Sequence, residues 1–147
     1  MLLRRMPASV SKAAAGTRNR MGWPDAPFPQ GEDRMIDSVA FGQMVIDGRR
    51  YTSDLIIFPD GRVADGWRRR KGHRLDAADL TGLLASEPEV IVAGTGISGQ
   101  MVPEPSLIDR MAVKQIRFIA EPNAAAVDVF NNLFAGRRVG GCFHLTC

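Results

Sequence analysis

The chain has 147 residues, of which 45% are hydrophobic and 24% are charged, proportions typical of an ordinary globular protein. This length is enough for one domain with a hydrophobic core of its own. No stretch of the sequence approaches the roughly 18 consecutive apolar residues that a membrane helix needs, so we expect no membrane span.

The net charge of +3 is not spread evenly along the chain. Residues 1–34 hold six of the nineteen basic residues and three of the sixteen acidic ones, so residues 35–147 contain thirteen of each. A nucleic-acid-binding protein usually carries its basic surface on the folded module itself. Because the folded part is neutral, the charge distribution argues against nucleic acid as a partner.

Residues 1–34 are predicted to form a disordered, basic leader. They are rich in Arg, Ala, Ser and Pro, contain no acid before Asp25, and end in a proline-broken run over 23–29. This composition is typical of an organelle transit peptide, which would place the protein in mitochondria. The alternatives are an unstructured bacterial extension or a start codon assigned too early, with Met35 as the natural first residue. We favour these alternatives, and with them a cytoplasmic location.

The first half of the folded part is predicted to be antiparallel β-structure. Asp47-Gly48 is a hairpin turn signal, and Pro59-Asp60-Gly61 is a turn that stops an apolar run. The strands that these turns separate are expected over residues 36–41, 43–46, 49–52 and 55–58, with 62–67 pairing back on the last.

The second half alternates helices and strands. Helices are predicted over 77–86, capped by Asp76, over 107–114, and from Pro122 or Asn123 to about 135. The strands between and after them are expected over 90–93, 116–120 and 139–145. This βαβαβ order implies an α/β fold with a partly parallel central sheet and right-handed crossovers.

A glycine-rich segment follows the strand over 90–93 and fits the pattern G-x-G-x-x-G. Glu121 lies about 20 residues later, where a ribose-binding acid would lie in a dinucleotide site. Pro103 and Pro105 argue against such a site, because they prevent the third glycine from opening a helix directly. We therefore assign no cofactor. The candidates for binding a small molecule or an anion are Gly94, Thr95, Gly96, Gly99 and Glu121; the alternative is a tight glycine turn at the edge of a sheet.

Residues 67–74, with the sequence WRRRKGHR, place five cations and an imidazole in eight positions. They could bind phosphate, nucleic acid or an acidic partner, or form a solvated hairpin tip. The neutral charge of the folded part favours the solvated tip. If the segment does bind, we expect an acidic protein rather than a nucleic-acid duplex, because Trp67 is the one aromatic residue nearby for base stacking.

Cys142 and Cys147 are predicted to be free thiols, because a strand would hold them roughly 16 Å apart whereas a disulfide needs Cα atoms within about 7 Å. Cys142 and His144 share one face of that strand and Cys147 points the other way, so we expect no metal site. The other imidazole is His73, and no Ser or Cys has a base specified nearby. No catalytic residues are therefore assigned.

Several stretches together resemble a known family. They are Trp67 with its Arg neighbours, the Gly72-His73 turn, the run 90–96, and the pattern Asn123-Ala-Ala-Ala, Phe130-Asn131, Leu133 and Gly136-Arg-Arg-Val139. The chain is similar over 36–147 to the adipogenesis-associated Mth domain family, which includes a mitochondrial respiratory complex I assembly factor and many uncharacterised bacterial proteins. The resemblance implies a three-layer fold around a central mixed sheet, with no established catalytic residues.

We therefore expect a non-catalytic assembly or interaction protein with an unidentified protein partner. The resemblance implies a link to respiratory complex biogenesis. The candidate docking residues are Trp67, Arg68, Arg69, Asn131, Arg137 and Arg138. The alternative is a small-molecule or anion-binding protein, or an enzyme, that uses the loop 94–99 at the carboxyl ends of the strands. A homodimer through an exposed edge of the antiparallel half also stays open.

Overall fold

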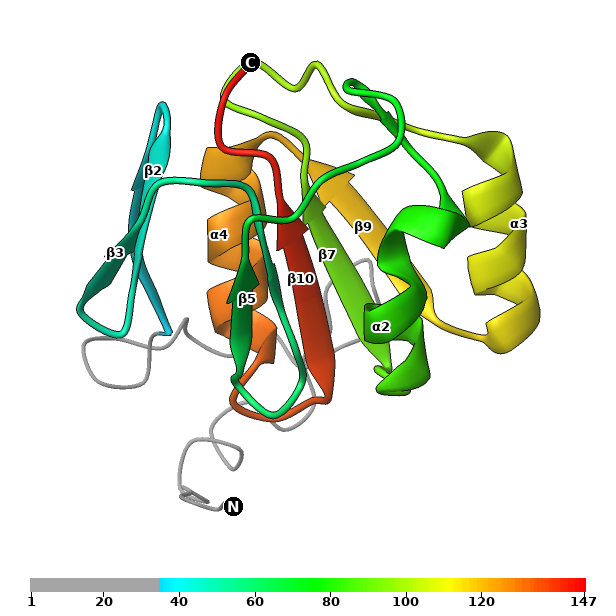
Figure 1. The fold of residues 1–147 in the computed structure, drawn as a ribbon. Coiled ribbons are helices and arrows are strands. Elements are labelled where there is room, and N and C mark those ends of the chain that lie inside the picture. The colour runs from blue at the N-terminus through cyan, green and yellow to red at the C-terminus, as the bar shows by residue number, and fades with distance from the viewer. Residues whose placement is uncertain (1–34) are drawn as a thin grey trace.

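The computed structural model describes residues 35–147, so the leader predicted over 1–34 lies outside the described residues. Its centre is a mixed five-stranded sheet with the strand order β5-β4-β10-β7-β9 (Figure 1). The parallel strands are β10, β7 and β9, whereas β4 is antiparallel to β10 and β5 is antiparallel to β4. The bounds are Leu55–Ile57 for β4, Val63–Asp65 for β5, Val90–Gly94 for β7, Arg117–Glu121 for β9 and Val139–Phe143 for β10.

Helices cover both faces of this sheet and confirm the predicted three-layer α/β fold. On one face lies α4, over Asn123–Leu133, and on the other lie α3, over Pro105–Lys114, and the pair η2–α2. The strands divide their buried side chains between these layers. For example, Leu55 and Ile57 pack on the side of α4, and Ile56 packs with Leu80, Leu83 and Leu107. Among residues 35–147, none of the helices combines the length and the apolar character that a membrane span requires.

The predicted helix over 77–86 forms as two short pieces. Asp76 accepts a hydrogen bond from the amide of Ala78, and the side chain of Asp79 accepts one from the amide of Asp76, which completes a capping box. The 3₁₀ turn η2 spans Ala77–Leu80 and the helix α2 spans Thr81–Ala85. Two short strands that the sequence did not indicate, β6 (Arg74–Leu75) and β8 (Val102–Pro103), pair in parallel beside them.

The first three strands form a sheet of their own instead of extending the central one. They are β1 (Ile36–Ala40), β2 (Gln43–Ile46) and β3 (Arg49–Tyr51), all antiparallel. Asp47 and Gly48 both have positive φ, as expected of the predicted hairpin turn. This small sheet packs beside α4, at the left in Figure 1, through the buried side chains of Ile36, Met44 and Ile46.

Asn131 ties the small sheet to α4. β1 is an edge strand of the small sheet, so those of its backbone groups that do not face β2 need other partners. The Oδ1 atom of Asn131 accepts hydrogen bonds from the amides of Ile36 (2.9 Å) and Met35 (3.2 Å), and its Nδ2 donates to the carbonyl of Ile36 (2.8 Å). The side chain that the sequence offered as a docking candidate is thus buried in an intramolecular role.

We predict that Asn131→Leu lowers the free energy of unfolding by about 2–3 kcal/mol, because backbone groups of Ile36 are left buried without their side-chain partner. Asn132→Ala is the matched control on the next residue of α4, and we expect it to change stability by less than about 0.5 kcal/mol. Urea unfolding followed by circular dichroism measures both values. Equal effects of the two substitutions on stability would contradict this role of Asn131.

Candidate functional site

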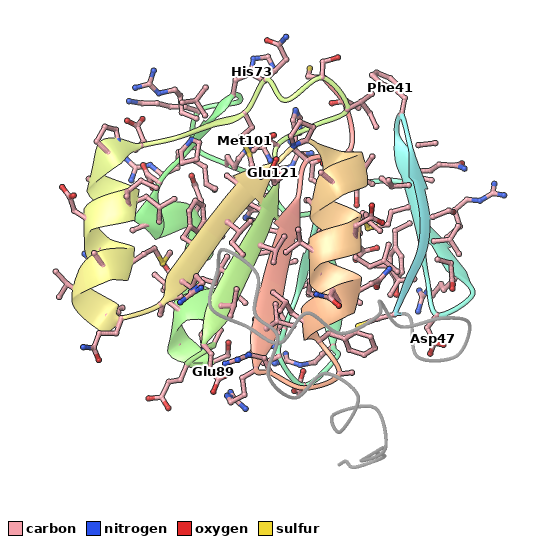
Figure 2. The ribbon with its side chains drawn as sticks, turned by 180° about the vertical axis from the view of Figure 1, so that it is seen from behind. Phe41, Asp47, His73, Glu89, Met101 and Glu121 are labelled. Atoms are coloured by element: carbon pink, nitrogen blue, oxygen red, sulfur yellow. The ribbon has the colours of Figure 1, made fainter. Side chains whose placement is uncertain are left out.

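Polar residues from distant parts of the chain meet where the parallel strands end. We call this end of the sheet the carboxyl edge. It is formed by the loop after β7, by the residues after β9, and by the segment 144–147 after β10. Asp54 lies at the same edge because it precedes the antiparallel strand β4. Figure 2 shows Glu121, Met101, His73 and Phe41 at this end of the molecule, and Asp47 and Glu89 at the opposite end.

Asp54 is the centre of this cluster. Its Oδ2 accepts hydrogen bonds from Nη1 of Arg69 (2.9 Å) and Nδ1 of His144 (2.8 Å), and its Oδ1 accepts one from the amide of Leu145 (2.8 Å). Burial by itself raises the pKa of Asp54, but the hydrogen bonds from Leu145, His144 and Arg69 outweigh burial and hold that pKa below its usual value. Asp54 is therefore an ionised carboxylate that accepts three hydrogen bonds.

This carboxylate fixes the orientation and the proton of His144. Nδ1 of His144 lies 2.8 Å from Oδ2 of Asp54 and 3.1 Å from Nη2 of Arg69. If Nδ1 carried no proton, it could accept a hydrogen bond from Arg69, but its lone pair would then repel the carboxylate of Asp54, which is the nearer of the two groups. We therefore assign the proton to Nδ1. The other ring nitrogen, Nε2, then has a free lone pair when the ring is neutral.

The Nε2 nitrogen of His144 is the unusual atom of the cluster. It is buried and has no hydrogen-bond partner among residues 35–147. Buried polar atoms are rarely left in this state, and each one calls for an explanation.

His73 and Cys147 complete the surroundings of His144. The Nε2 atom of His73 lies 3.2 Å from Sγ of Cys147, and the two imidazole rings meet edge to face with centroids 5.8 Å apart. One ring nitrogen from each histidine and the sulfur of Cys147 all lie within 4.8 Å of one another. His73 is exposed, Cys147 is partly exposed and His144 is buried, so the group opens to solvent on one side.

The structure agrees with the prediction of two free cysteines, but the strand argument against a cluster at Cys147 does not hold. Both cysteines are free, and Cys142 is buried in the core between sheet and helices. The strand ends at Phe143 rather than at 145, because the amide of Leu145 donates to Asp54 instead of continuing the ladder. The next residues leave the strand direction, and His73 approaches from another part of the chain.

The loop 94–99 packs against the 144–147 segment through its glycines. A Cβ on Gly94 would lie 2.3 Å from the ring of Phe143, and one on Gly96 would lie 2.6 Å from the carbonyl oxygen of Thr146. The backbone amides in this loop have partners inside the chain: those of residues 95, 96, 97 and 99 all donate to oxygens of the protein. The two glycines are thus required by close packing, independently of any ligand.

Asn123 joins all three segments of the carboxyl edge, a role that the sequence analysis missed. Its Oδ1 accepts a hydrogen bond from the amide of Gly96 (3.1 Å), and its Nδ2 donates to the carbonyl of His144 (2.8 Å). The side chain is fully buried. Of the other predicted ligand-binding residues, Thr95 is buried beside Gly99, and Glu121 is half-buried with its carbonyl accepting from the amide of Thr95.

The predicted docking residues divide between the two ends of the sheet. Trp67 donates from Nε1 to the carbonyl of Asp79, and the guanidinium of Arg69 stacks on its ring, whereas Arg68 is exposed. Arg137 and Arg138 precede β10 and so lie at the opposite end, where Arg138 donates to the carbonyls of Ser86 and Glu87 and Arg137 borders a shallow cleft. Because these two groups of residues lie at opposite ends of the sheet, a single docking surface cannot contain both.

We predict that the native, metal-free protein has one reactive thiol. Cys142 is fully buried, and burial raises the pKa of its thiol to about 12, whereas Cys147 is partly exposed beside His73. Alkylation followed by mass spectrometry should label Cys147 in the folded protein and Cys142 after unfolding. Cys142→Ala should leave native labelling unchanged and Cys147→Ser should abolish it. Equal labelling rates for the two thiols in the native protein would contradict this arrangement.

Comparison with known proteins places the chain among uncharacterised relatives. Crystallised PH1505, a conserved hypothetical protein from Pyrococcus horikoshii OT3, is 29% identical, with a TM-score of 0.66 over 76% of this chain and 98% of that one. The protein MT938 is 28% identical, with a TM-score of 0.63 over 77% of this chain and 98% of that one. A Mth938-like domain from Bordetella pertussis shares the fold at 20% identity, with a TM-score of 0.57 over 80% of this chain and 89% of that one. No curated protein matches.

These similarities confirm the resemblance to Mth-domain proteins inferred from the sequence. A family model described as "Protein of unknown function (DUF498/DUF598)" matches residues 36–144. The match includes all the described strands and helices and leaves out residues 35 and 145–147 of the described part. The chain therefore belongs to the DUF498/DUF598 family.

Proposed function

We propose that this chain is a non-catalytic interaction protein that binds an acidic segment of a partner protein at its carboxyl edge. The observation that carries the proposal is that cations without an ion-pair partner among residues 35–147 and exposed apolar side chains lie at the same edge of the sheet. We call residues 67–74 the basic loop. The surface that this loop forms with the exposed side chains of Phe41, Ile97 and Val102 is called the docking face.

The basic loop is anchored from within and presents cations outward. Arg69 is almost fully buried, donates to Asp54 and to the carbonyl of Gly72, and so fixes the course of the loop. Arg68 and Arg70 are exposed and form no ion pair within residues 35–147. Two unpaired guanidinium groups on a fixed loop attract carboxylates without first having to break internal contacts.

Apolar side chains are also exposed on three other segments at the carboxyl edge. They are Phe41, Ile97 and Val102, with relative exposures of 68%, 39% and 52%. The amide of Val102 donates to the carbonyl of His73, and the amides of Ile97 and of Gly42, the neighbour of Phe41, donate to Thr146 and Leu145. Hydrogen bonds thus hold all three segments to the same edge of the sheet.

Such a surface suits a protein partner better than a free anion. Apolar side chains supply contact area that excludes water, and the cations steer an acidic partner and fix its register. The sequence resemblance to a family that includes a respiratory complex I assembly factor makes subunits of respiratory complexes the first partners to look for. The proposal assigns Arg137 and Arg138, at the opposite end, no part in this contact.

We predict that the double substitution Arg68→Glu/Arg70→Glu removes at least one host protein that cross-links to the full-length chain, reducing its recovery about tenfold or more. The matched control is Arg50→Glu/Arg110→Glu, which makes the same change of charge on β3 and α3. Quantitative mass spectrometry of cross-linked material from the native host measures the recovery. We expect the recovery of the same protein to fall as the salt concentration rises.

A further double variant, Arg137→Ala/Arg138→Ala, tests the opposite end of the sheet. Retained cross-linking in this variant, together with loss in the Arg68/Arg70 variant, is the expected outcome. The proposal fails if every captured protein is retained by the Arg68/Arg70 variant, or if the two ends of the sheet affect capture equally.

A further inference from the structure

We propose that His73, His144 and Cys147 bind a zinc ion at the carboxyl edge. This inference goes beyond the proposed interaction function and does not depend on it. It rests on the convergence of the three donor groups, on the unpartnered ring nitrogen of His144, and on the carboxylate that orients that ring.

The three donor atoms are already close to the spacing that a single zinc ion requires. Zinc binds nitrogen at about 2.0–2.1 Å and thiolate sulfur at about 2.3 Å, so two donors on one tetrahedral ion lie roughly 3.3–3.8 Å apart. Nε2 of His73 and Sγ of Cys147 are 3.2 Å apart, and a ring nitrogen of His144 lies within 4.8 Å of a ring nitrogen of His73 and of that sulfur. A movement of about 1 Å by the exposed His73 and the partly exposed Cys147 brings the set to this spacing.

His144 supplies a second observation in favour of a metal, independent of the spacing of the donor atoms. Its side chain is 7% exposed, and its Nε2 atom is buried with no hydrogen-bond partner in the described part of the chain. Leaving a buried acceptor unsatisfied costs free energy, which a metal bound at Nε2 would recover. Because Nδ1 donates to Asp54, the lone pair is on Nε2, the nitrogen that has no other partner.

The contact with Asp54 is the one that metal-binding histidines usually make. A ligating histidine almost always donates its other ring N–H to a carboxylate or a carbonyl, which fixes the tautomer and raises the basicity of the ligating nitrogen. Here that carboxylate also pairs with Arg69, so the guanidinium and the carboxylate neutralise each other.

Zinc fits the donor set better than a hard cation does. Imidazole and thiolate are the ligands that zinc prefers, whereas magnesium and calcium prefer carboxylate and carbonyl oxygens. Zinc has a filled d shell and tolerates the angles that the protein offers. Three protein ligands leave a fourth position, on the side where His73 is exposed, for a water molecule.

The experiment uses the full chain without a histidine tag, kept reduced and freed of metal by a chelator. The sequence has two histidines and two cysteines, so Cys142 is a matched control for Cys147. Zinc is titrated calorimetrically, and Co²⁺ is titrated as a spectroscopic substitute, because thiolate-bound Co²⁺ absorbs by charge transfer from sulfur. We expect one ion per chain and a thiolate–cobalt absorption band.

We expect Cys147→Ser to abolish the cobalt absorption band. We expect His73→Ala to weaken zinc binding more than about 100-fold, which exceeds the 10–100-fold loss typical of removing a residue that only orients a ligand, such as Asp54. Both substitutions are at exposed or partly exposed positions, and circular dichroism verifies that each variant folds. Cys142→Ala should bind as the parent does.

The proposal is overturned if the parent chain shows no stoichiometric zinc binding at micromolar concentration. It is also overturned if Cys147→Ser or His73→Ala, once shown to be folded, binds zinc as tightly as the parent, or if Cys142→Ala removes the thiolate–cobalt band.

Discussion

The carboxylate of Asp54 joins the basic loop and the 144–147 segment to the start of β4. Asp54 precedes β4, and it accepts hydrogen bonds from the basic loop through Arg69 and from the 144–147 segment through His144 and Leu145. Because these donors lie far apart in sequence, each one is brought to the edge by tertiary structure. The same contacts direct Arg68 and Arg70 outward and leave Nε2 of His144 facing away from the carboxylate, so the proposed docking face and the proposed zinc site both depend on Asp54.

The glycine loop shows how a packing requirement can imitate a binding motif. The pattern over 94–99 matches a dinucleotide fingerprint in sequence, but its glycines allow the loop to lie against Phe143 and Thr146. Asn123 then bridges the loop and the 144–147 segment, with an amide that both accepts and donates. The loop therefore acts as the support for the carboxyl edge, and the groups able to bind a ligand lie on the residues that it supports.

The sequence predicted the parts of the fold that local pattern controls. Apolar runs located β7 and β10, the Asp47-Gly48 turn was correct, and Asp76 caps a helical turn as expected. The separate sheet of β1–β3 was not predicted, since it depends on Asn131, 95 residues from Ile36. The approach of His73 to Cys147, 74 residues away, was missed for the same reason, and an assumed straight strand through 145 argued against it. A sequence pattern shows which residues share a face of one helix or strand, whereas contacts between elements can be identified only from the tertiary structure.

The most direct test of this account is the protonation state of the two histidine rings. Long-range ¹H–¹⁵N correlation spectra of the full chain, recorded without metal at about pH 8, where histidine rings are ordinarily neutral, distinguish a proton on Nδ1 from one on Nε2. With two histidines in the chain, assignment needs one variant, His73→Ala. The account predicts the proton of His144 on Nδ1, held by Asp54, and a bare Nε2 nitrogen. A proton on Nε2 of His144 would mean that Asp54 does not orient this ring, and would contradict the central claim.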